Sequence, residues 1–299
     1  MEVYKPVIEP WPEPLFASRG IRVALLRDDV WGGPMQGNKW RKLRYNLEEF
    51  RLSGKKYMLS FGGAFSNHLY ATAWAGKKYG IPVRMIVRGE EPAQWSPTLK
   101  DAAAFGAELL FVSRTEYTRL LKGGAALREH EFPDAFTVPE GGNNAAGAAG
   151  CEEIAEIAAL NGFTHVCAAL GTGTTAAGIL QGAGNTDLRI GIYPVLKGIA
   201  PPFPLTGKTL WRDAWHFGGY ARVTDELLQF GLDMYRRFGI PLDPVYTAKL
   251  LFGVWQDTAA GLFPQGSRVL VYHSGGMQGA RGFPAYYEEL CRLGFSLPE

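Results

Sequence analysis

The chain has 299 residues, of which 46% are hydrophobic and 20% are charged, and its formal net charge is +2. This composition is typical of a globular protein, and the length suffices for one large domain or two smaller ones. The near-neutral charge and the lack of a long Lys/Arg block disfavour a nucleic-acid partner. Because no apolar run approaches the roughly 20 residues that span a bilayer, we expect no membrane partner.

The cysteines and the N-terminal segment bear on the cellular compartment. Cys151, Cys167 and Cys291 lie far apart, and none belongs to a C-x-x-C motif. We therefore expect neither a disulfide framework nor a bound metal. Three isolated cysteines are compatible with a reducing compartment. Residues 1–11 are polar and contain proline, unlike a signal peptide. The sequence predicts a cytoplasmic protein.

Short apolar runs alternate with helical segments along the chain. In chain order, we expect strands over 57–61, 81–87, 107–113, 135–139, 164–170, 188–195 and 268–273. Helices are expected over 66–79, 98–105, 150–160, 175–181, 223–238, 244–259 and 279–293, and another should begin near Gly37. Apolar strands between helices are typical of parallel sheets that are covered on both faces. The predicted fold class is α/β, doubly wound, with a crossing between two lobes near 138–150.

A glycine-rich run follows the strand predicted over 164–170. It consists of Gly171, Thr172, Gly173, Thr174 and Thr175. A strand, a glycine-rich turn and a helix N-terminus together present backbone N–H groups to an anion, and the threonines add hydroxyl donors. The same run could be an ordinary tight connection with a threonine cap. It also matches a dinucleotide motif, but the next strand lacks the acidic residue that this motif requires. We therefore favour a phosphate site.

The basic segment that begins at Gly37 offers a candidate nucleophile, Lys39. An amine attacks a carbonyl only when neutral, whereas a free lysine is protonated at pH 7. Burial beside Arg41 or Lys42 would lower the pKa of Lys39. The alternative is a solvated basic helix face. Together with the phosphate loop, Lys39 suggests an enzyme that holds a phosphorylated aldehyde cofactor as a Schiff base.

Other polar motifs follow predicted strands. Ser66, Asn67 and His68 open a helix, which allows either a helix cap or a polar cluster under a ligand. The segments 140–144 and 273–276 also follow strands. Ligands of open α/β sheets bind at such carboxyl ends of strands, although each segment taken alone is compatible with a simple turn.

Six motifs, taken together and in this order, resemble those of the pyridoxal-phosphate enzymes of the 1-aminocyclopropane-1-carboxylate deaminase and D-cysteine desulfhydrase family, of the tryptophan synthase β-like fold (fold type II). They are Gly-Asn-Lys-Trp-Arg-Lys-Leu at 37–43, Ser-Asn-His at 66–68, Pro-Glu-Gly-Gly-Asn-Asn at 139–144, Gly-Thr-Gly-Thr-Thr-Ala-Ala-Gly at 171–178, Leu-Asp-Pro-Val-Tyr-Thr at 242–247 and His-Ser-Gly-Gly at 273–276. The resemblance runs from residue 37 to about residue 282.

The resemblance implies roles for the residues that match these motifs. Lys39 would hold pyridoxal phosphate covalently, Asn67 would bond its 3′ oxygen, and the loop 171–175 would hold its phosphate. The substrate, a small amino acid, would lie among Ser66, Asn67, His68, Tyr220 and Tyr246. The family is usually a homodimer with two doubly wound open sheets. The large domain would comprise 1–42 and 142–299, and the small domain 43–141.

The resemblance also separates two activities. Ring-opening deaminases of the family typically have a glutamate after the tyrosine that matches Tyr246, whereas this chain has Thr247 there, and Ser274 after His273. Neutral hydroxyls against the pyridine favour β-elimination to a 2-oxo acid and ammonia, with Lys39, Ser66 or Tyr246 moving the α-proton. The alternatives are a cyclopropane deaminase, a racemase or dehydratase, and a non-catalytic cofactor- or nucleotide-binding protein. Phe65 replaces the usual glutamine, which makes the pocket more apolar.

Overall fold

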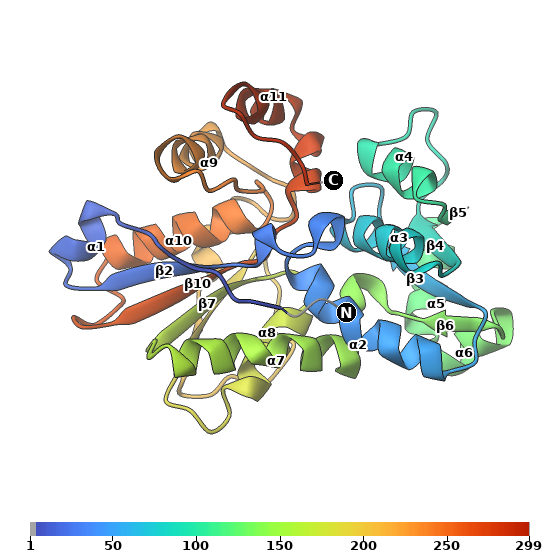
Figure 1. The fold of residues 1–299 in the computed structure, drawn as a ribbon, viewed down its shortest axis with the longest axis horizontal. Coiled ribbons are helices and arrows are strands. Elements are labelled where there is room, and N and C mark those ends of the chain that lie inside the picture. The colour runs from blue at the N-terminus through green and yellow to red at the C-terminus, as the bar shows by residue number, and fades with distance from the viewer. Residues whose placement is uncertain (1–3, 299) are drawn as a thin grey trace.

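The computed structural model describes residues 4–298, which form two open sheets (Figure 1). The larger sheet has the order β1 (Ile8–Pro10), β2 (Arg22–Arg27), β10 (Arg268–His273), β7 (His165–Leu170), β8 (Arg189–Pro194), β9 (Thr209–Trp211). The smaller has the order β5 (Glu108–Val112), β4 (Val83–Arg88), β3 (Tyr57–Gly62), β6 (Ala135–Thr137). Within these sheets, neighbouring strands are parallel except for the antiparallel pair of β1 and β2. The α/β prediction with two open sheets is confirmed.

Helices cover both sheets. They are α1 (Pro14–Ser18), α2 (Asn38–Leu52), α3 (Asn67–Tyr79), α4 (Pro97–Ala104), α5 (Arg114–Lys122), α6 (Gly124–Glu131), α7 (Ala145–Leu160), α8 (Thr174–Gly182), α9 (Asp225–Phe238), α10 (Thr247–Ala259) and α11 (Pro284–Arg292). In Figure 1, α10 lies above the larger sheet and α7 below it. Helix α2 packs against both α7 and α3, and so joins the two halves of the fold. Among these helices, none has the length and apolarity needed to cross a bilayer.

The four central strands of the larger sheet, β2, β10, β7 and β8, are buried on both faces, which explains their continuous apolar sequences. Leu25 and Val271 point into the core under α10, while their neighbours Leu26 and Leu270 point into the core on the other side. This alternation follows from the two-residue period of a strand. The smaller sheet likewise separates two apolar clusters.

Several predicted boundaries differ from the structure for local reasons. The helix expected over 150–160 begins at Ala145, because the Asn144 side chain caps it by accepting a hydrogen bond from Gly147 N at 2.9 Å. The segment expected to be helical over 279–293 contains a 3₁₀ helix, η5 (Met277–Gly282), and then α11, whose first residue is Pro284. The elements β1, β2, β9, α1, α5 and α6 are not among those that the sequence predicts.

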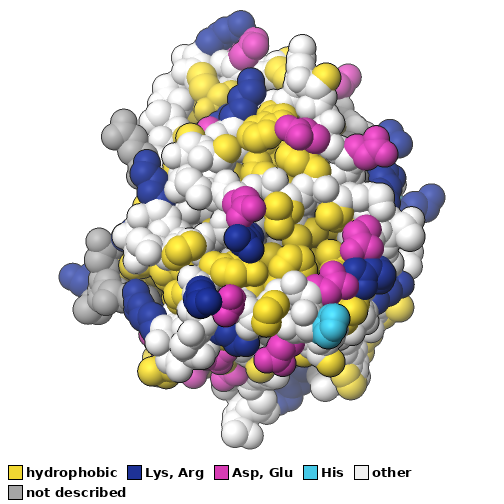
Figure 2. Space-filling model, turned by 90° about the vertical axis from the view of Figure 1, so that its right-hand side faces the viewer, with side chains coloured by type: hydrophobic (Ala, Val, Ile, Leu, Met, Phe, Trp, Pro, Cys, Tyr) yellow, Lys and Arg dark blue, Asp and Glu magenta, His cyan; other side chains and the backbone are white. Residues whose placement is uncertain are grey.

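Strand β5 forms the outer edge of the smaller sheet, and its last four residues are half-buried. Figure 2 shows this end of the molecule, where apolar side chains lie among charged side chains of both signs. One rim pair joins Arg84 Nε to Glu108 Oε2 at 2.6 Å. Charged side chains on an edge strand are a common protection against edge-to-edge association.

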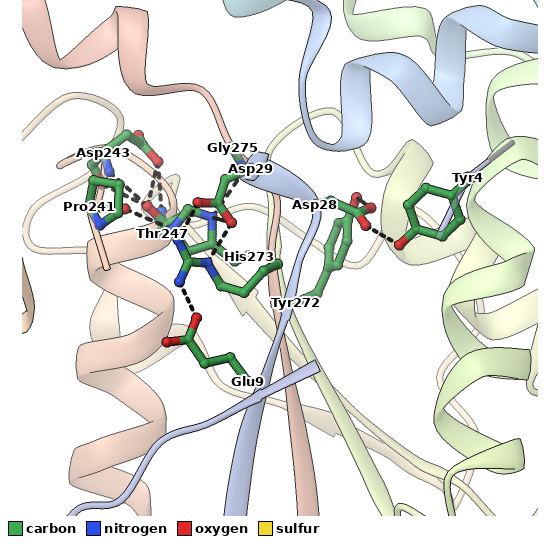
Figure 3. Close-up of polar contacts among 11 residues, drawn as sticks. Tyr4, Glu9, Asp28, Asp29, Pro241, Asp243, Thr247, Tyr272, His273 and Gly275 are labelled. Carbon is green, nitrogen blue, oxygen red and sulfur yellow. Dashed lines mark hydrogen bonds and ion pairs between the residues drawn. The ribbon is translucent and has the colours of Figure 1, made fainter. Parts of the chain in front are cut away.

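A buried ion pair fixes helix α2 to the larger sheet. Asp28, which follows β2, accepts hydrogen bonds from Arg41 Nε at 2.5 Å and from the hydroxyl of Tyr272 on β10 at 2.8 Å. The Tyr4 hydroxyl also donates to Asp28 (Figure 3). Arg41 is fully buried and reaches Glu153 on α7 at 3.0 Å. Its charge is therefore matched by carboxylates.

We expect Arg41→Met to lower the free energy of unfolding by about 3–5 kcal/mol, because removing one partner leaves the buried Asp28 carboxylate without a counter-charge. Urea denaturation followed by circular dichroism measures this change. Arg119→Met is the matched control, since Arg119 pairs with Glu116 and Glu131 at the surface and should matter far less. Equal losses in the two variants would contradict the role assigned to Arg41.

Candidate active site

A cavity of about 530 Å³ lies where carboxyl ends of strands from both sheets meet. Its walls come from the end of β4 and from the segments that follow β3, β6, β7, β8 and β10, together with the start of α2. The carboxyl ends of strands are the expected location for a ligand in an open α/β sheet. Most of the predicted site residues line this cavity: Lys39, Ser66, Asn67, His68, Gly171, Thr172, Gly173, Thr175, Tyr220, Tyr246 and Ser274.

Lys39 is the second residue of α2, and a glycine fixes where this helix starts. Gly37 has φ +69°, and a Cβ built on it would lie 1.9 Å from the carbonyl oxygen of Ser274. Asn38 N also donates to that carbonyl at 3.2 Å. Only glycine fits so close to another backbone. The helix therefore begins against the end of β10, with Lys39 at the cavity.

The amine of Lys39 is electrostatically suited to attack a carbonyl. Burial, and then the charge of Lys42, lower the pKa of Lys39 to about 7. Arg41, which the sequence offers as another cause, is paired with Asp28. Lys39 Nζ donates to Asn38 Oδ1 at 2.6 Å. About half of the amine is thus neutral at pH 7, whereas an ordinary lysine has a pKa of roughly 10.4.

The glycine-rich loop has the geometry of an anion site. Gly173 adopts φ +93° immediately before α8, so the free N–H groups of the first helical turn lie at the end of the loop. Asn38 Nδ2 donates to Thr175 Oγ1 at 3.1 Å, which ties the loop to the segment that carries Lys39. Thr174 is the residue of this loop that does not line the cavity. It is buried, and its hydroxyl donates to Asn143 Oδ1 at 3.0 Å.

Ser66 and Asn67 lie at the start of α3, which follows β3. The Ser66 hydroxyl caps the helix by accepting from Leu69 N at 3.2 Å, so the capping interpretation of the sequence is correct and the side chain also lines the cavity. Asn67 Oδ1 accepts a hydrogen bond from Gln278 Nε2. A Cβ on Gly276 would lie 2.4 Å from Asn67 Nδ2, so the chain after β10 holds this amide in place.

His68 is neutral and carries its proton on Nε2. The Ser60 hydroxyl donates its proton to Val138 O at 2.7 Å, so the 2.8 Å bond between Ser60 Oγ and His68 Nε2 must be donated by the imidazole. His68 Nδ1 is consequently unprotonated, and it has no hydrogen-bond partner among the described residues. Burial and the charges of Lys39 and Lys42 hold the pKa of His68 well below its ordinary value.

Two tyrosines line the cavity beside the start of the glycine-rich loop. The rings of Tyr220 and Tyr246 meet edge to face, with centroids 6.1 Å apart. Tyr246 is the more deeply placed, since a Cβ on Gly171 would lie 2.9 Å from its ring. Burial raises the pKa of Tyr246 well above the ordinary tyrosine value, so its hydroxyl stays protonated and able to donate.

Ser274 lines the cavity, but the structure does not bring Thr247 to its wall. The Thr247 hydroxyl donates to Asp243 Oδ2 at 2.8 Å and accepts from Asp243 N at 2.8 Å (Figure 3). The Asp243 carboxylate also accepts from the backbone N–H groups of residues 245, 246 and 247. Because of this loop, α10 begins at Thr247, three residues after the predicted start at Pro244.

Some cavity residues are not among the sequence candidates. They are Asn38, Lys42, Arg88 and Glu140. Lys42 is buried and donates to Gly141 O at 3.1 Å. Arg88 is the last residue of β4 and directly follows the strand predicted over 81–87, which was a usable signal, and Glu140 opens the segment 140–144 that the sequence already places after a strand.

Lys249 of α10 supports Tyr220 from behind the cavity. Its Nζ donates to His216 O at 2.9 Å and to Gly219 O at 2.7 Å. The bridged loop contains Phe217 at φ +53° and continues into Ala221 at φ +54°, which L residues rarely adopt. One ammonium group thus holds a strained loop in the conformation that places Tyr220.

Comparisons with known proteins identify the family of this chain. The model of the pyridoxal-phosphate dependent enzyme family matches residues 11–275. The chain belongs to this family. A putative 1-aminocyclopropane-1-carboxylate deaminase of Thermotoga maritima is 30% identical over 288 residues, covering 87% of this chain and 90% of that protein. The mitochondrial bifunctional D-cysteine desulfhydrase/1-aminocyclopropane-1-carboxylate deaminase of Arabidopsis thaliana is 28% identical over 297 residues, covering 87% and 73%.

Solved structures support the same assignment. A structure described as a homologue of 1-aminocyclopropane-1-carboxylate deaminase has a TM-score of 0.79 at 25% identity, covering 97% of this chain and 94% of that one. A pyridoxal 5′-phosphate-dependent aspartate racemase, at 15% identity and a TM-score of 0.62, shares the fold. The predicted family, fold type and enzyme class are confirmed, and so is pyridoxal phosphate as the cofactor.

The lowered pKa of Lys39 predicts a shallow pH dependence for its reaction with an aldehyde. With a pKa of about 7, the neutral fraction rises only about tenfold between pH 6 and pH 8, whereas a lysine near 10.4 would change about a hundredfold. Apoprotein mixed with pyridoxal phosphate should show this tenfold rise in initial rate, measured by borohydride trapping and peptide mass spectrometry. The exposed Lys56 provides the internal control in the same digest. A hundredfold rise at Lys39 would show that its amine is not perturbed.

Replacing Lys249 should loosen the loop that carries Tyr220. We expect Lys249→Met to speed amide hydrogen exchange over 216–221, because it removes two charge-assisted hydrogen bonds worth about 1.5–3 kcal/mol each. Lys249→Arg should restore part of the protection. Lys55→Met is the control, since Lys55 bonds Pro133 O at a distant surface. Unchanged exchange in Lys249→Met would refute the supporting role.

Proposed function

We propose that this enzyme catalyses β-elimination from a small amino acid, releasing a 2-oxo acid and ammonia as a D-cysteine desulfhydrase does. The observation that carries the proposal is the placement of an amine with a pKa of about 7 in the same cavity as the anion site at α8. The substrate class and the reaction are supported by relatives named for D-cysteine desulfhydrase and 1-aminocyclopropane-1-carboxylate deaminase activities.

The residues of the cavity fit pyridoxal phosphate. The loop 171–175 and the first turn of α8 would hold the phosphate, Lys39 would provide the amine, and the Asn67 amide would bond the ring 3′ oxygen. When bound, the cofactor supplies an aldehyde for covalent attachment and a ring that accepts the electrons left at Cα. Gly276 and Gln278 hold the Asn67 amide, which limits the positions that the ring can take.

The chain itself positions the substrate and moves protons. The Ser66 and Tyr220 hydroxyls offer polar contacts to an amino acid in the cavity, and His68 forms part of the cavity wall. The free amine of Lys39, with a pKa of about 7, would be neutral often enough at pH 7 to remove the α-proton. Tyr246 stays protonated and can donate to a leaving group. Such proton transfer is typically worth about 10²–10⁴-fold in rate.

The surroundings of α10 favour elimination over ring opening. By the resemblance, Thr247 occupies the sequence position at which ring-opening deaminases carry a glutamate, and its hydroxyl is engaged by Asp243. Asp243 is itself satisfied by three backbone N–H groups, while Ser274 presents a neutral hydroxyl to the cavity. A ring without a carboxylate partner is the weaker electron sink, and elimination of a good leaving group asks less of it. Ring opening of the cyclopropane is the second candidate, because relatives carry that name.

The domain division into 1–42 plus 142–299 and 43–141 remains a proposal, as do the homodimer and the cytoplasmic location. The division is supported by the strands of the smaller sheet, β3 to β6, which all lie between residues 57 and 137. The cavity is lined from both proposed domains, by Ser66 on one side and the loop 171–175 on the other.

A product assay on the holoenzyme tests the proposal. We expect pyruvate from D- or L-cysteine at a higher kcat/KM than 2-oxobutyrate from 1-aminocyclopropane-1-carboxylate. Lys39→Ala should abolish turnover and the near-visible absorption of the bound cofactor, whereas Lys56→Ala, at an exposed site, should keep both. Retained absorption in Lys39→Ala would contradict the covalent role, and 2-oxobutyrate as the main product would favour the ring-opening alternative.

A further inference from the structure

A second cavity of about 230 Å³ adjoins the first. The two share four lining residues, Phe65, Asn67, Tyr220 and Tyr246, so the smaller cavity is a side arm of the larger. We call it the side arm. Its remaining wall consists of Ala221, Asp243, Val245, Gly279, Gly282 and Phe283. None of the residues assigned to the cofactor's phosphate lies in it.

The side arm is suited to an uncharged, apolar group. Phe65, Val245 and Phe283 supply its largest apolar surfaces, and Phe65 is 51% exposed. Among residues 4–298, no lysine or arginine lines it. Its one acidic group, Asp243, has both carboxylate oxygens occupied by hydrogen bonds from its own loop. A charged ligand group would therefore find no free counter-charge there.

Two glycines keep the side arm open. A Cβ on Gly282 would lie 3.4 Å from the Phe65 ring, and one on Gly279 would lie 3.0 Å from Asn67 Oδ1. Because both glycines line the side arm, a larger side chain at either position would take up part of its space. For comparison, an apolar cavity of about 150 Å³ in another protein takes up benzene. The arm is thus large enough for an aromatic ring or a short alkyl chain.

The side arm opens from the cavity at Tyr246 and Tyr220, the residues proposed to lie beside the substrate. A group attached to the β-carbon of a substrate amino acid would leave the cavity by this route. We infer that the side arm binds the β-substituent, and that the substrates are alanines with an apolar group attached through a β-sulfur, namely S-alkyl or S-aryl-alkyl cysteines. This inference rests on the proposed β-elimination.

This β-elimination needs only the substrate and water as reactants. The α-proton leaves Cα, the Cβ–S bond breaks, and sulfur departs with the bonding electron pair and takes up a proton as the free thiol. Water hydrolyses the remaining enamine to pyruvate and ammonium. Nothing is oxidised or reduced overall. Tyr246, whose hydroxyl stays protonated, lies at the junction where the departing sulfur would need that proton.

The test uses the holoenzyme and both enantiomers of S-benzylcysteine and of cysteine, with pyruvate and free thiol as products. We expect kcat/KM for S-benzylcysteine to exceed that for cysteine by about tenfold or more, since each buried methylene is worth roughly 10–200-fold in an apolar pocket. A second readout is independent of turnover: the change in cofactor absorption on titration should give a correspondingly lower Kd for S-benzylcysteine.

Two variants probe the side arm from different walls. Phe65→Gln makes it polar at an exposed position, and Gly282→Leu fills it. Both should reduce the preference for S-benzylcysteine at least about tenfold, and Gly282→Leu, which lies outside the larger cavity, should change cysteine turnover little. Leu52→Gln, which alters an exposed leucine on α2 far from the arm, is the matched control and should keep the preference.

The outcomes separate the inference from the function that it rests on. Pyruvate from cysteine with no preference for S-benzylcysteine overturns the inference and leaves β-elimination in place. A preference that survives in both Phe65→Gln and Gly282→Leu also overturns it, because the apolar group must then bind elsewhere. If no amino acid yields a 2-oxo acid or alters the cofactor absorption, the proposed function fails and the inference with it.

Discussion

The buried ion pair between Arg41 and Asp28 is the contact on which the site depends. It fixes the first turn of α2 to the end of β2, while Gly37 brings the start of the same helix against the end of β10. Residues two apart on a helix point to different sides. With Arg41 held on one side by Asp28, Lys39 is left facing the cavity. One short segment, the first turn of α2, therefore sets the positions of both the Lys39 amine and the Arg41 guanidinium.

The same arrangement keeps the amine reactive. Of the buried carboxylates, Asp28 is paired with Arg41, and Asp243 accepts hydrogen bonds from its own loop. The charge of Asp243 raises the pKa of Lys39, but desolvation and the charge of Lys42 outweigh it and favour the neutral amine. A free carboxylate at the same place would have kept it protonated and unreactive.

The sequence predicts the features that are local. Strand β10 is predicted at its observed bounds, and the glycine-rich loop, Ser66 and Tyr246 all reach the cavity as expected. The sequence does not predict the contacts that form between segments far apart along the chain. The partner of Arg41 is Asp28, in an unpredicted strand region, and the partner of Thr247 is an aspartate whose loop replaces a predicted helical turn. Lys249 resembles any helical lysine until the carbonyls of the 216–219 loop are placed beside it.

The strand order of the larger sheet has a consequence for the order of folding. Strand β10, near the C-terminus, lies between β2 and β7, and pairs with both. During synthesis β2 and β7 emerge long before β10. The two parts of this sheet, β1 with β2 and β7 with β8 and β9, therefore cannot join until β10 has been synthesised. A nascent chain that ends before residue 268 can complete the smaller sheet but leaves both apolar edges of the larger one unpaired. The chain thus passes through a stage at which it is exposed to aggregation.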